Sequence, residues 1–407
     1  MTDGIVPMRF SRFAAVALAC ALAAPAFAQK KYGPGVTDTE IKLGQTMPYS
    51  GPASAYGAIG KAELAYFRMV NERGGINGRR VNLISLDDAY APPRAVEQVR
   101  RLVEEDDVLA LFQTLGTPTN TAFHKYVNVK KVPHLFLATG ATKWGDPKHY
   151  PWTIGFQPAY QVEARIYARY ILSNKPDAKI AVLYQNDDYG KDYVKGLRDG
   201  LGDKARSMIV AEVSYEVTDA TVDSQIVTLK SSGADTFFNV TTPKFAAQAI
   251  RKAHDIGWKP LHIINNVASS VGAVLIPAGL DKSTGLITAL YFKDPNDPQW
   301  AKDAGMQRWR DFMARYMPGA DISDFNYVYG YGAAQLMTQV LAACGDDLTR
   351  ENLMKQAISL RDMTLDVTLP GVKFSTGPND YYLIEQLQMA RFDGKRWVLF
   401  GEVIGQE

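Results

Sequence analysis

Two pairs of neighbouring aspartates, Asp87-Asp88 and Asp187-Asp188, are the residues of this chain whose types and spacing best fit acid–base chemistry. Each pair directly follows an apolar run, and paired carboxylates placed after strands are common in active sites. Adjacent side chains usually point apart, however, and the helices that follow need acceptors for their first free N–H groups. We therefore interpret both pairs as helix caps or as surface groups that face a hinge.

Other reactive arrangements are missing from the sequence. It contains no C-x-x-C, H-E-x-x-H or G-x-S-x-G motif, and its five histidines show no ligand spacing. Gly330-Tyr331-Gly332 begins like a dinucleotide fingerprint but lacks the third glycine and lies in a helical pattern, so it indicates helix packing. We expect no catalytic residue, no metal and no cofactor, and therefore a binding function.

The first 28 residues have the pattern of a secretory signal peptide. Arg9 and Arg12 precede an apolar run at 13–24, and Ala26-Phe27-Ala28 fits an A-x-A cleavage site. Cleavage after Ala28 leaves a secreted chain, and Met8 is an alternative start. A membrane anchor is the other interpretation, but a bilayer span needs about 20 apolar residues, which neither this run nor any later segment reaches.

Cysteine usage limits how the secreted chain is stabilised. Cys20 raises the alternative of a lipid anchor, but Ala17-Leu18-Ala19 matches the usual box before a lipidated cysteine poorly. After cleavage Cys344 is the only cysteine, so no intramolecular disulfide can form in an oxidising compartment. Packing must therefore hold the fold together.

Charge and aromatic content narrow the range of partners. The chain has 45 Lys and Arg against 43 Asp and Glu, and no basic run interleaves with aromatics, so we expect no nucleic-acid partner. Aromatic residues make up 11% of the chain, with 21 Tyr and 6 Trp. They indicate either large cores or a pocket that stacks on flat or apolar ligands.

The elements that position these residues alternate between short apolar strands and amphipathic helices. In the first part we expect strands at 41–47, 81–86, 108–112 and 134–137 and helices at 58–71, 94–105 and 118–129. This βαβα order predicts an open, mostly parallel, doubly wound sheet.

A second copy of this order follows residues 152–156. We expect helices at 159–173, 191–201, 222–231 and 244–256 and strands at 180–184, 208–213, 236–239 and 261–264. Two sheets in series suit a chain too long for one core, and they place a ligand in the crevice between them. The strand at 286–291 and the helices at 298–316, 326–343 and 350–358 show no third domain, so we expect them to return to the first lobe, whereas the tail at 372–403 is strand-rich.

An ordered set of motifs resembles the Leu/Ile/Val-binding proteins that serve ABC importers. The run Leu43–Pro52 resembles the first strand and loop of that family, and Asn71–Arg79 resembles its helix-ending N-x-x-G-G-I-x-G turn, where a glycine of positive φ closes the helix. Asp87-Asp88-Ala89 and Asn186–Gly190 fall at the expected places. The resemblance extends from Glu40 to the C-terminus.

The resemblance implies an α/β, type I periplasmic binding fold with two Rossmann-like lobes, three hinge crossings and a ligand in the interlobe cleft. Crossings near Phe156, Tyr291 and Phe374 give a first lobe of 38–156 plus 292–373 and a second of 157–291 plus 374–407. The expected protein is a periplasmic monomer that delivers a small carboxylate ligand to an ABC permease complex in the inner membrane.

The resemblance also implies a carboxylate site in one lobe. Main-chain and hydroxyl donors would come from Gly116-Thr117 and from Ala141-Thr142. Independently, Thr117 can cap the helix that Pro118 opens, and the free N–H groups of that first turn attract an anion. A Thr117 that only caps the helix is the alternative.

The resemblance also assigns four positions that would contact the rest of the ligand, beyond its carboxylate. Asn266 stands where the family's amino-acid binders carry an acid for the ammonium group, and an ammonium buried without a counter-charge is costly. Thr242 replaces a usual tyrosine, and Tyr56 and Tyr189 match aromatic walls of the cleft. We expect an aromatic or other apolar organic acid. A branched-chain amino acid, a sensor on the same fold and a secreted α/β enzyme are the alternatives.

One further departure concerns a disulfide that is frequent in the family. It would require cysteines at the positions of Tyr90 and Leu115, and both are missing together.

Overall fold

The structure is a computed structural model that describes residues 1–4 and 30–405. The expected charged and apolar segments of the signal peptide, its cleavage site, Met8 and Cys20 lie outside the described residues. Among the residues described, no helix is long and apolar enough to cross a membrane.

The first lobe is built on a five-stranded, fully parallel sheet with the strand order β3-β2-β4-β5-β6. Its central strands are largely buried, as expected for a parallel sheet covered on both faces. The strands are β2 (Glu40–Met47), β3 (Arg80–Asp87), β4 (Ala110–Phe112), β5 (His134–Leu137) and β6 (Thr153–Gly155), and the helices between them are α1 (Gly57–Glu72), α2 (Pro92–Glu104) and α3 (Thr117–Val129).

The second lobe contains a seven-stranded sheet with the order β14-β13-β11-β10-β9-β7-β8. The five strands from β11 to β8 pair in parallel. At the other edge, β13 pairs antiparallel with both β11 and β14. The strands are β7 (Ile180–Gln185), β8 (Ile209–Tyr215), β9 (Thr236–Val240), β10 (Leu261–Ile264), β11 (Ile287–Leu290), β13 (Leu387–Phe392) and β14 (Trp397–Ile404), and the main helices are α4 (Tyr160–Asn174), α5 (Asp188–Leu201), α7 (Asp223–Ser231) and α8 (Pro243–Asp255).

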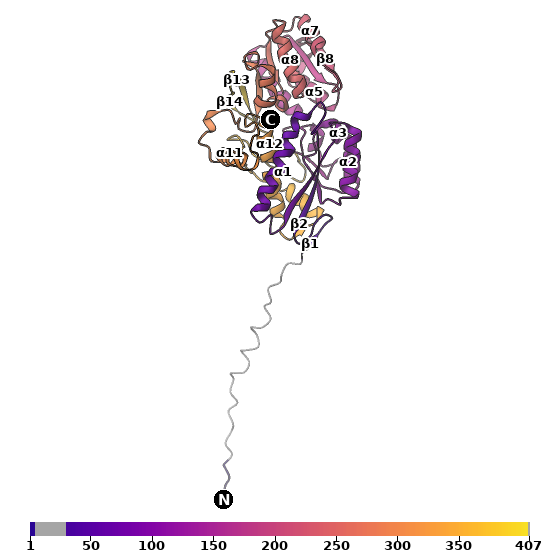
Figure 1. Cartoon of the computed structure of the whole chain (residues 1–407), viewed down its shortest axis with the longest axis vertical. Coiled ribbons are helices and arrows are strands. Elements are labelled where there is room, and N and C mark those ends of the chain that lie inside the picture. The colour runs from indigo at the N-terminus through magenta and orange to yellow at the C-terminus, as the bar shows by residue number, and fades with distance from the viewer. Residues whose placement is uncertain (5–29, 406–407) are drawn as a thin grey trace.

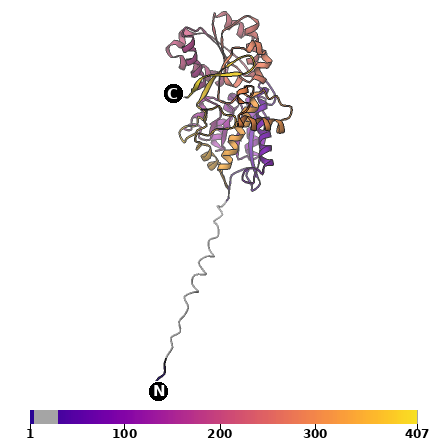
Figure 2. The same cartoon turned by 90° about the vertical axis from the view of Figure 1, so that its left-hand side faces the viewer.

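Figure 1 shows the two lobes one above the other, with α1, α2 and α3 in the lower lobe and α5, α7 and α8 in the upper one. The yellow C-terminal strands cross to the upper lobe (Figure 2). The prediction that the tail at 372–403 is rich in strands is confirmed, because it contains β13 and β14. The pattern-based expectation that strand 286–291 returns to the first lobe is wrong, because β11 pairs with β10 and β13 in the second sheet; the boundary near Tyr291 implied by the resemblance had put this strand in the second lobe.

Three later helices return to the first lobe, as the pattern predicts. They are α11 (Ala304–Tyr316), α12 (Phe325–Ala343) and α13 (Arg350–Ala357), and α12 packs along α1. A Cβ on Gly330 would lie 2.5 Å from the Ile59 carbonyl, so the glycine lets the two helices approach closely. The prediction that the Gly-Tyr-Gly segment serves helix packing is confirmed.

Short segments complete the chain. The small strands β1 (Lys31–Tyr32) and β12 (Asp347–Leu348) pair with each other in parallel. The remaining segments are the short helices α6 (Ala205–Met208), α9 (Ile276–Ala278) and α10 (Leu280–Ser283), single turns at Ser54–Tyr56, Thr142–Gly145, Gly202–Lys204, Asn266–Ala268 and Pro298–Trp300, and a π-helical turn at Val271–Leu275.

The aspartate pairs serve turns and caps. Asp187 caps α5, because its carboxylate accepts a hydrogen bond from the Tyr189 N–H at 2.9 Å. Asp88 accepts from the Tyr90 N–H at 2.8 Å, but it is fully buried, and burial raises the pKa of its carboxyl to about 6. The interpretation as a cap therefore holds for Asp187, whereas a surface role is wrong for Asp88.

Candidate ligand-binding site

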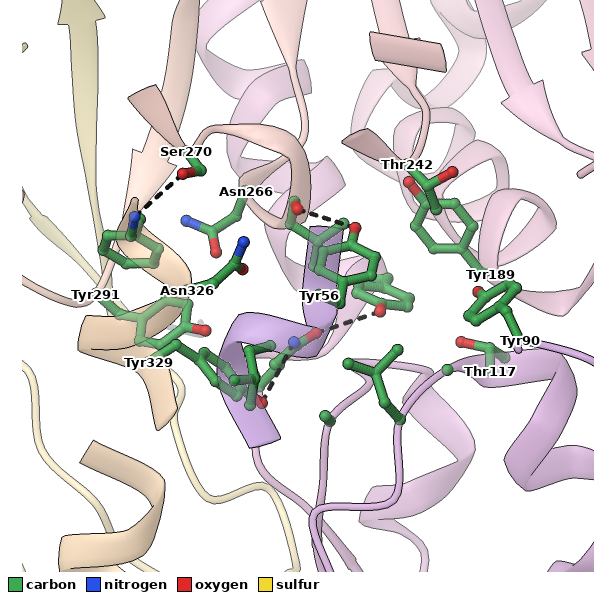
Figure 3. A pocket seen from close by; sticks show the side chains of 18 residues that line it. Tyr56, Tyr90, Thr117, Tyr189, Thr242, Asn266, Ser270, Tyr291, Asn326 and Tyr329 are labelled. Atoms are coloured by element: carbon green, nitrogen blue, oxygen red, sulfur yellow. Dashed lines mark hydrogen bonds between the residues drawn. The ribbon is translucent and has the colours of Figure 1, made fainter. Parts of the chain in front are cut away.

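A cavity lies between the two lobes, at the carboxyl ends of the parallel strands. About 570 Å³ of space free of protein atoms, part of it open solvent, lies at this place, and only about 40 Å³ of it admits the centre of a water-sized sphere in this conformation. Side chains of both lobes face it (Figure 3). Its lining consists of Tyr56, Ile59, Tyr90, Leu115, Gly116, Thr117, Ala138, Gln157, Tyr160, Tyr189, Thr242, Asn266, Val267, Ser270, Tyr291, Phe325, Asn326 and Tyr329. Within the described residues, this lining contains no charged side chain and no histidine.

Six of the eight residues expected from the sequence meet at this cavity. They are Tyr56, Gly116, Thr117, Tyr189, Thr242 and Asn266. The other two, Ala141 and Thr142, lie outside its lining. Both the backbone N–H and the hydroxyl of Thr142 donate to the Asp192 carboxylate of α5, at 2.7 and 2.8 Å. Thr142 thus joins the first lobe to the second.

The loops that form the floor of the cavity follow two irregular strand ends. Gln113 after β4 and Phe136 within β5 have left-handed backbones, with φ of 53° and 57°, and the Gln113 N–H donates to Leu135 O at 3.1 Å. Residues other than glycine adopt such conformations only at a cost, and they cluster at functional sites. The two irregularities lie beside each other and precede the loops that carry Leu115 and Ala138 into the cavity.

Thr117 does not cap helix α3. The N-cap is Gly116, and Thr117 is the first helical residue, with its hydroxyl 2.6 Å from the Thr139 hydroxyl. The predicted capping role is therefore wrong, because the helix begins one residue earlier than the pattern indicates. Both residues line the cavity at the start of α3, where the free N–H groups of a first helical turn attract negative charge.

The aromatic wall beside this helix start depends on an unusual turn. Ala89 and Tyr90 have φ of 53° and 59°, and their N–H groups are held by Asp87 Oδ1 and Asp88 Oδ1 at 3.0 and 2.8 Å. The Tyr90 ring packs so closely on Gly116 that a Cβ there would lie 2.5 Å from it. The ring of Tyr90 therefore requires glycine at this position.

Asn266 is held in place by two bonds that leave its amide oxygen free for the cavity. Its backbone N–H donates to Glu163 Oε1 at 2.7 Å, and its side-chain nitrogen donates to Ala289 O at 2.6 Å. Glu163 lies behind it and also accepts from the hydroxyls of Tyr167 and Tyr193 at 2.8 and 2.7 Å. Complete burial raises the pKa of the Glu163 carboxyl to about 7.

The remaining predicted residues are fixed by hydrogen bonds within the second lobe. The Tyr189 hydroxyl and the Asn265 side-chain amide are 2.6 Å apart. The Thr242 N–H donates to the Tyr215 hydroxyl at 3.0 Å, and Thr242 is the N-cap residue of α8. These contacts hold both side chains in the cavity wall before any ligand arrives.

Several hydrogen bonds join the lobes around the cavity. The Tyr56 hydroxyl donates to Val267 O at 3.0 Å, across the cleft (Figure 3). On one edge, Lys143 Nζ lies 2.8 Å from the Asp188 carboxylate of α5. On the other, the Ser270 hydroxyl donates to the Asp324 carboxylate at 2.8 Å. The lobes are therefore in contact in this conformation.

This architecture and sequence match a known protein family. The model of a periplasmic binding protein family matches residues 40–396. The chain belongs to this family. Leu/Ile/Val-binding protein homolog 7 of Brucella suis biovar 1 (strain 1330) is 25% identical to this periplasmic binding protein over 388 residues, which cover 90% of the chain and 91% of the relative.

Solved structures with this fold come from several bacteria. A branched-chain amino acid ABC transporter protein of Thermus thermophilus with bound valine has a TM-score of 0.82 and 17% identity, covering 91% of this chain and 98% of that one. A solute-binding protein of R. palustris in complex with benzoate gives 0.75 and 20%, with 90% and 98% covered. A fatty acid ABC transporter substrate-binding protein of Thermomonospora curvata gives 0.78 and 22%, with 93% and 95% covered. The predicted family and α/β two-lobed fold are confirmed.

Sequence reasoning missed part of the cavity of this periplasmic binding protein. The residues it did not foresee include Tyr90, Gln157, Tyr160, Asn326 and Tyr329. Tyr90 could have been flagged, because it occupies a position where relatives were expected to carry a cysteine. Asn326 and Tyr329 lie on α12, far along the chain, and no local motif marks them.

Proposed function

We propose that this protein captures an aromatic or similarly apolar organic carboxylate in the periplasm and delivers it to the permease complex of an ABC importer in the inner membrane. The observation that carries the proposal is the tyrosine-rich cavity between the lobes, whose described lining has no charged side chain. Family relatives and neighbours include proteins named for Leu/Ile/Val binding, for fatty acids and for benzoate, so the fold serves both zwitterions and simple acids.

The electrostatics of the cavity favour a single negative charge over a zwitterion. The first turn of α3 offers backbone N–H groups and the positive end of a helix dipole to an anion. An ammonium group would meet only neutral groups there, such as the Asn266 amide oxygen, and burying it without a counter-charge is costly. A branched-chain amino acid is therefore the weaker candidate ligand.

The proposed mechanism is closure without covalent chemistry. A ligand that contacts the Thr117 side and the Asn266 side together stabilises the closed form by its higher affinity for that form. Hydrogen bonds between the lobes, such as that from the Tyr56 hydroxyl to Val267 O, also stabilise the closed form. The ligand then leaves unchanged, and we expect the protein to act as a secreted monomer whose closed surface is recognised by the permease.

A sensor on the same fold would bind the same ligand class but signal to a regulatory partner. Ligand binding alone does not separate the two roles. Uptake of the labelled ligand in cells that carry or lack this protein does, because only a transport component changes the rate of entry.

The proposal is tested by thermal unfolding of the secreted chain with benzoate, hydroxybenzoates, hydroxycinnamates, leucine, isoleucine and valine. Ligand at 100 times its Kd stabilises the folded state by about 2.7 kcal/mol, which raises Tm by roughly 2 to 4 °C for a protein of this size. We expect shifts with the aromatic acids. Shifts with leucine, isoleucine or valine alone would overturn the proposed ligand class and leave a transport role in place.

A further inference from the structure

Two asparagine side chains, Asn266 and Asn326, lie together on one side of the cavity, and Thr117 lies on the other (Figure 3). The two asparagines come from different lobes. Asn266 begins the single turn Asn266–Ala268 after β10 in the second lobe, whereas Asn326 lies in the first turn of α12, which packs in the first lobe. A ligand that reaches this side of the cavity therefore meets one amide from each lobe.

Asn326 is held in the same way as Asn266. Its backbone N–H donates to the Asp324 carboxylate at 2.9 Å, and its side-chain nitrogen donates to Ala55 O at 3.4 Å. In both residues a backbone carbonyl accepts from the side-chain nitrogen, so the orientation of the amide is fixed and its oxygen is the free end. Among the described residues, no group donates a hydrogen bond to either amide oxygen. The two amides therefore offer a ligand hydrogen-bond acceptors.

These two acceptors are buried and require a donor. Asn266 and Asn326 are only 5% and 6% exposed, and a buried amide oxygen without a partner is costly. The Ser270 hydroxyl lines the same side of the cavity, but it donates to the Asp324 carboxylate at 2.8 Å. The Tyr291 hydroxyl makes no hydrogen bond within the described part of the chain. The protein itself thus leaves both oxygens for a ligand to satisfy.

The opposite side of the cavity has the complementary character. Thr117 lines it at the start of α3, where the N–H groups of the first helical turn attract a negative charge. Behind the asparagines, in contrast, lie the two buried carboxylates that accept their backbone N–H groups. Negative charge on either acid repels a ligand carboxylate from that side. The cavity therefore has a donor side that suits a carboxylate and an acceptor side that suits an uncharged donor.

We propose that the ligand is a hydroxylated aromatic acid, whose carboxylate binds at the start of α3 and whose hydroxyl group donates to the amide oxygens of Asn266 and Asn326. A hydroxyl group donates a hydrogen bond without a charge, whereas an ammonium group would require a counter-charge that the described cavity lining lacks. Because one amide comes from each lobe, the same hydroxyl group favours the closed form. The inference rests on the proposed function, because it requires a carboxylate ligand in this cavity.

The test measures by calorimetry on the secreted chain whether a hydroxyl group on the ligand ring tightens binding. The hydroxylated ligands are meta-hydroxybenzoate, para-hydroxybenzoate and para-hydroxycinnamate. Each is compared with its parent acid, benzoate or cinnamate, and with its methyl ether, which keeps the oxygen and removes the proton. We expect the tightest hydroxylated acid to bind about tenfold to a hundredfold more tightly than its parent and its methyl ether, because those two leave the buried acceptors unpaired.

Two variants assign the effect to the amides. Asn266→Leu and Asn326→Leu each remove one amide oxygen at similar side-chain size, and each should lower the preference for the hydroxylated acid over its parent by about three- to tenfold. Asn352→Leu is the matched control, because the Asn352 side-chain nitrogen also donates to a backbone carbonyl, Asp347 O at 2.6 Å, but lies outside the cavity lining. The control should keep the preference, since a loss of stability alone weakens the binding of both acids by one common factor.

The outcomes separate the two proposals. If the unaltered protein binds benzoate or cinnamate as tightly as every hydroxylated acid, the inference is overturned and the proposed function stands. An unchanged preference in both asparagine variants would also overturn the inference, because another part of the cavity would then bind the hydroxyl group. If the unaltered protein binds none of the aromatic acids, both proposals fail.

Discussion

The backbone N–H of Asn266 donates to the buried carboxylate of Glu163 at 2.7 Å. The acid therefore lies one layer behind the cavity and not in its wall, where it would face the ligand. It holds the turn that presents Asn266, and two tyrosine hydroxyls donate to it from the other side. The second lobe thus uses its buried acid to position a neutral amide.

Glu163 should make the stability of the protein depend on pH. Burial raises its pKa in the folded protein to about 7, whereas in the unfolded chain it ionises near 4.5. The folded state therefore binds more protons between these values, and the free energy of unfolding falls by about 3 kcal/mol as pH rises from 4.5 to 7, then levels off. Glu163→Gln should remove this component in thermal unfolding scans across pH, whereas Glu97→Gln, at an exposed position, should retain it. Equal slopes for the two variants would contradict the assignment.

Tyr56→Phe should weaken ligand binding through closure. The variant loses the hydrogen bond from the Tyr56 hydroxyl to Val267 O, which joins the lobes. A neutral hydrogen bond contributes about 1 kcal/mol, so Kd should rise roughly fivefold for every ligand, as measured by calorimetry. Tyr49→Phe is the control, because its hydroxyl bonds Ser85 within the first lobe, 2.7 Å away. A loss in the control of the same size would show that the effect comes from general destabilisation.

The repeating order of strands and helices could be predicted from the sequence because it depends on local periodicity. Apolar runs such as His134–Leu137 and Leu261–Ile264 coincide with strands β5 and β10. The local pattern did not assign strand β11 to its sheet, because that depends on pairing with β13, about 100 positions later in the chain, whereas the lobe boundaries implied by the family resemblance included this strand in the second lobe. Local patterns identify an element but do not choose its partners.

The cavity shows the same limit. Thr117 and Asn266 were found because the resemblance to the family assigned a role to their positions, and both line the site. Tyr90 was missed because its direction is set by a left-handed backbone at φ 59°, which its residue type disfavours. Tyr160 was missed because its position depends on the absence of a side chain at Gly140. Such contacts arise from exact backbone geometry, which spacing does not record.

Thr142→Ala and Asp192→Asn should lower affinity without changing selectivity. Both alter the contact between the Thr142 hydroxyl and the Asp192 carboxylate, which joins the lobes at 2.8 Å outside the cavity. A less populated closed state raises every Kd by one common factor, expected here to be about two- to tenfold, and X-ray scattering should show a larger radius for the ligand-free variants. A loss confined to carboxylates, with benzamide unaffected, would instead indicate that Thr142 contacts the ligand.

Asp188→Asn should lower ligand affinity less than Asp192→Asn, although both residues lie at the same edge of the cleft. Its ion pair with Lys143 spans 2.8 Å, but the Asp188 side chain is 55% exposed. Exposed pairs contribute about 0 to 1 kcal/mol and are screened by salt. The change in affinity should therefore be smaller than for Asp192→Asn and should disappear at high ionic strength.

Cys344 should be unreactive in the folded protein. The thiol is buried, and burial raises its pKa to about 12, so almost no thiolate is present at neutral pH. An aromatic disulfide reagent should label the secreted chain only when denaturant unfolds it, with one thiol released per chain. Rapid labelling under native conditions would show that α12 opens locally at its C-terminal end.

Asn266→Asp tests whether a neutral amide at this position excludes amino acids. The side-chain nitrogen of Asn266 donates to Ala289 O at 2.6 Å, so a carboxylate there would face that carbonyl without a proton between them. The new acid should be destabilising, more so as pH rises and it ionises, because burial opposes its charge. Its charge would also repel a ligand carboxylate, so benzoate affinity should fall more than tenfold at pH 8 and recover partly at pH 5. Leucine, which carries an ammonium group, should lose less affinity or gain some. Equal losses for benzoate and leucine at both pH values would show that the substitution disrupts the turn and that charge at position 266 does not set the ligand class.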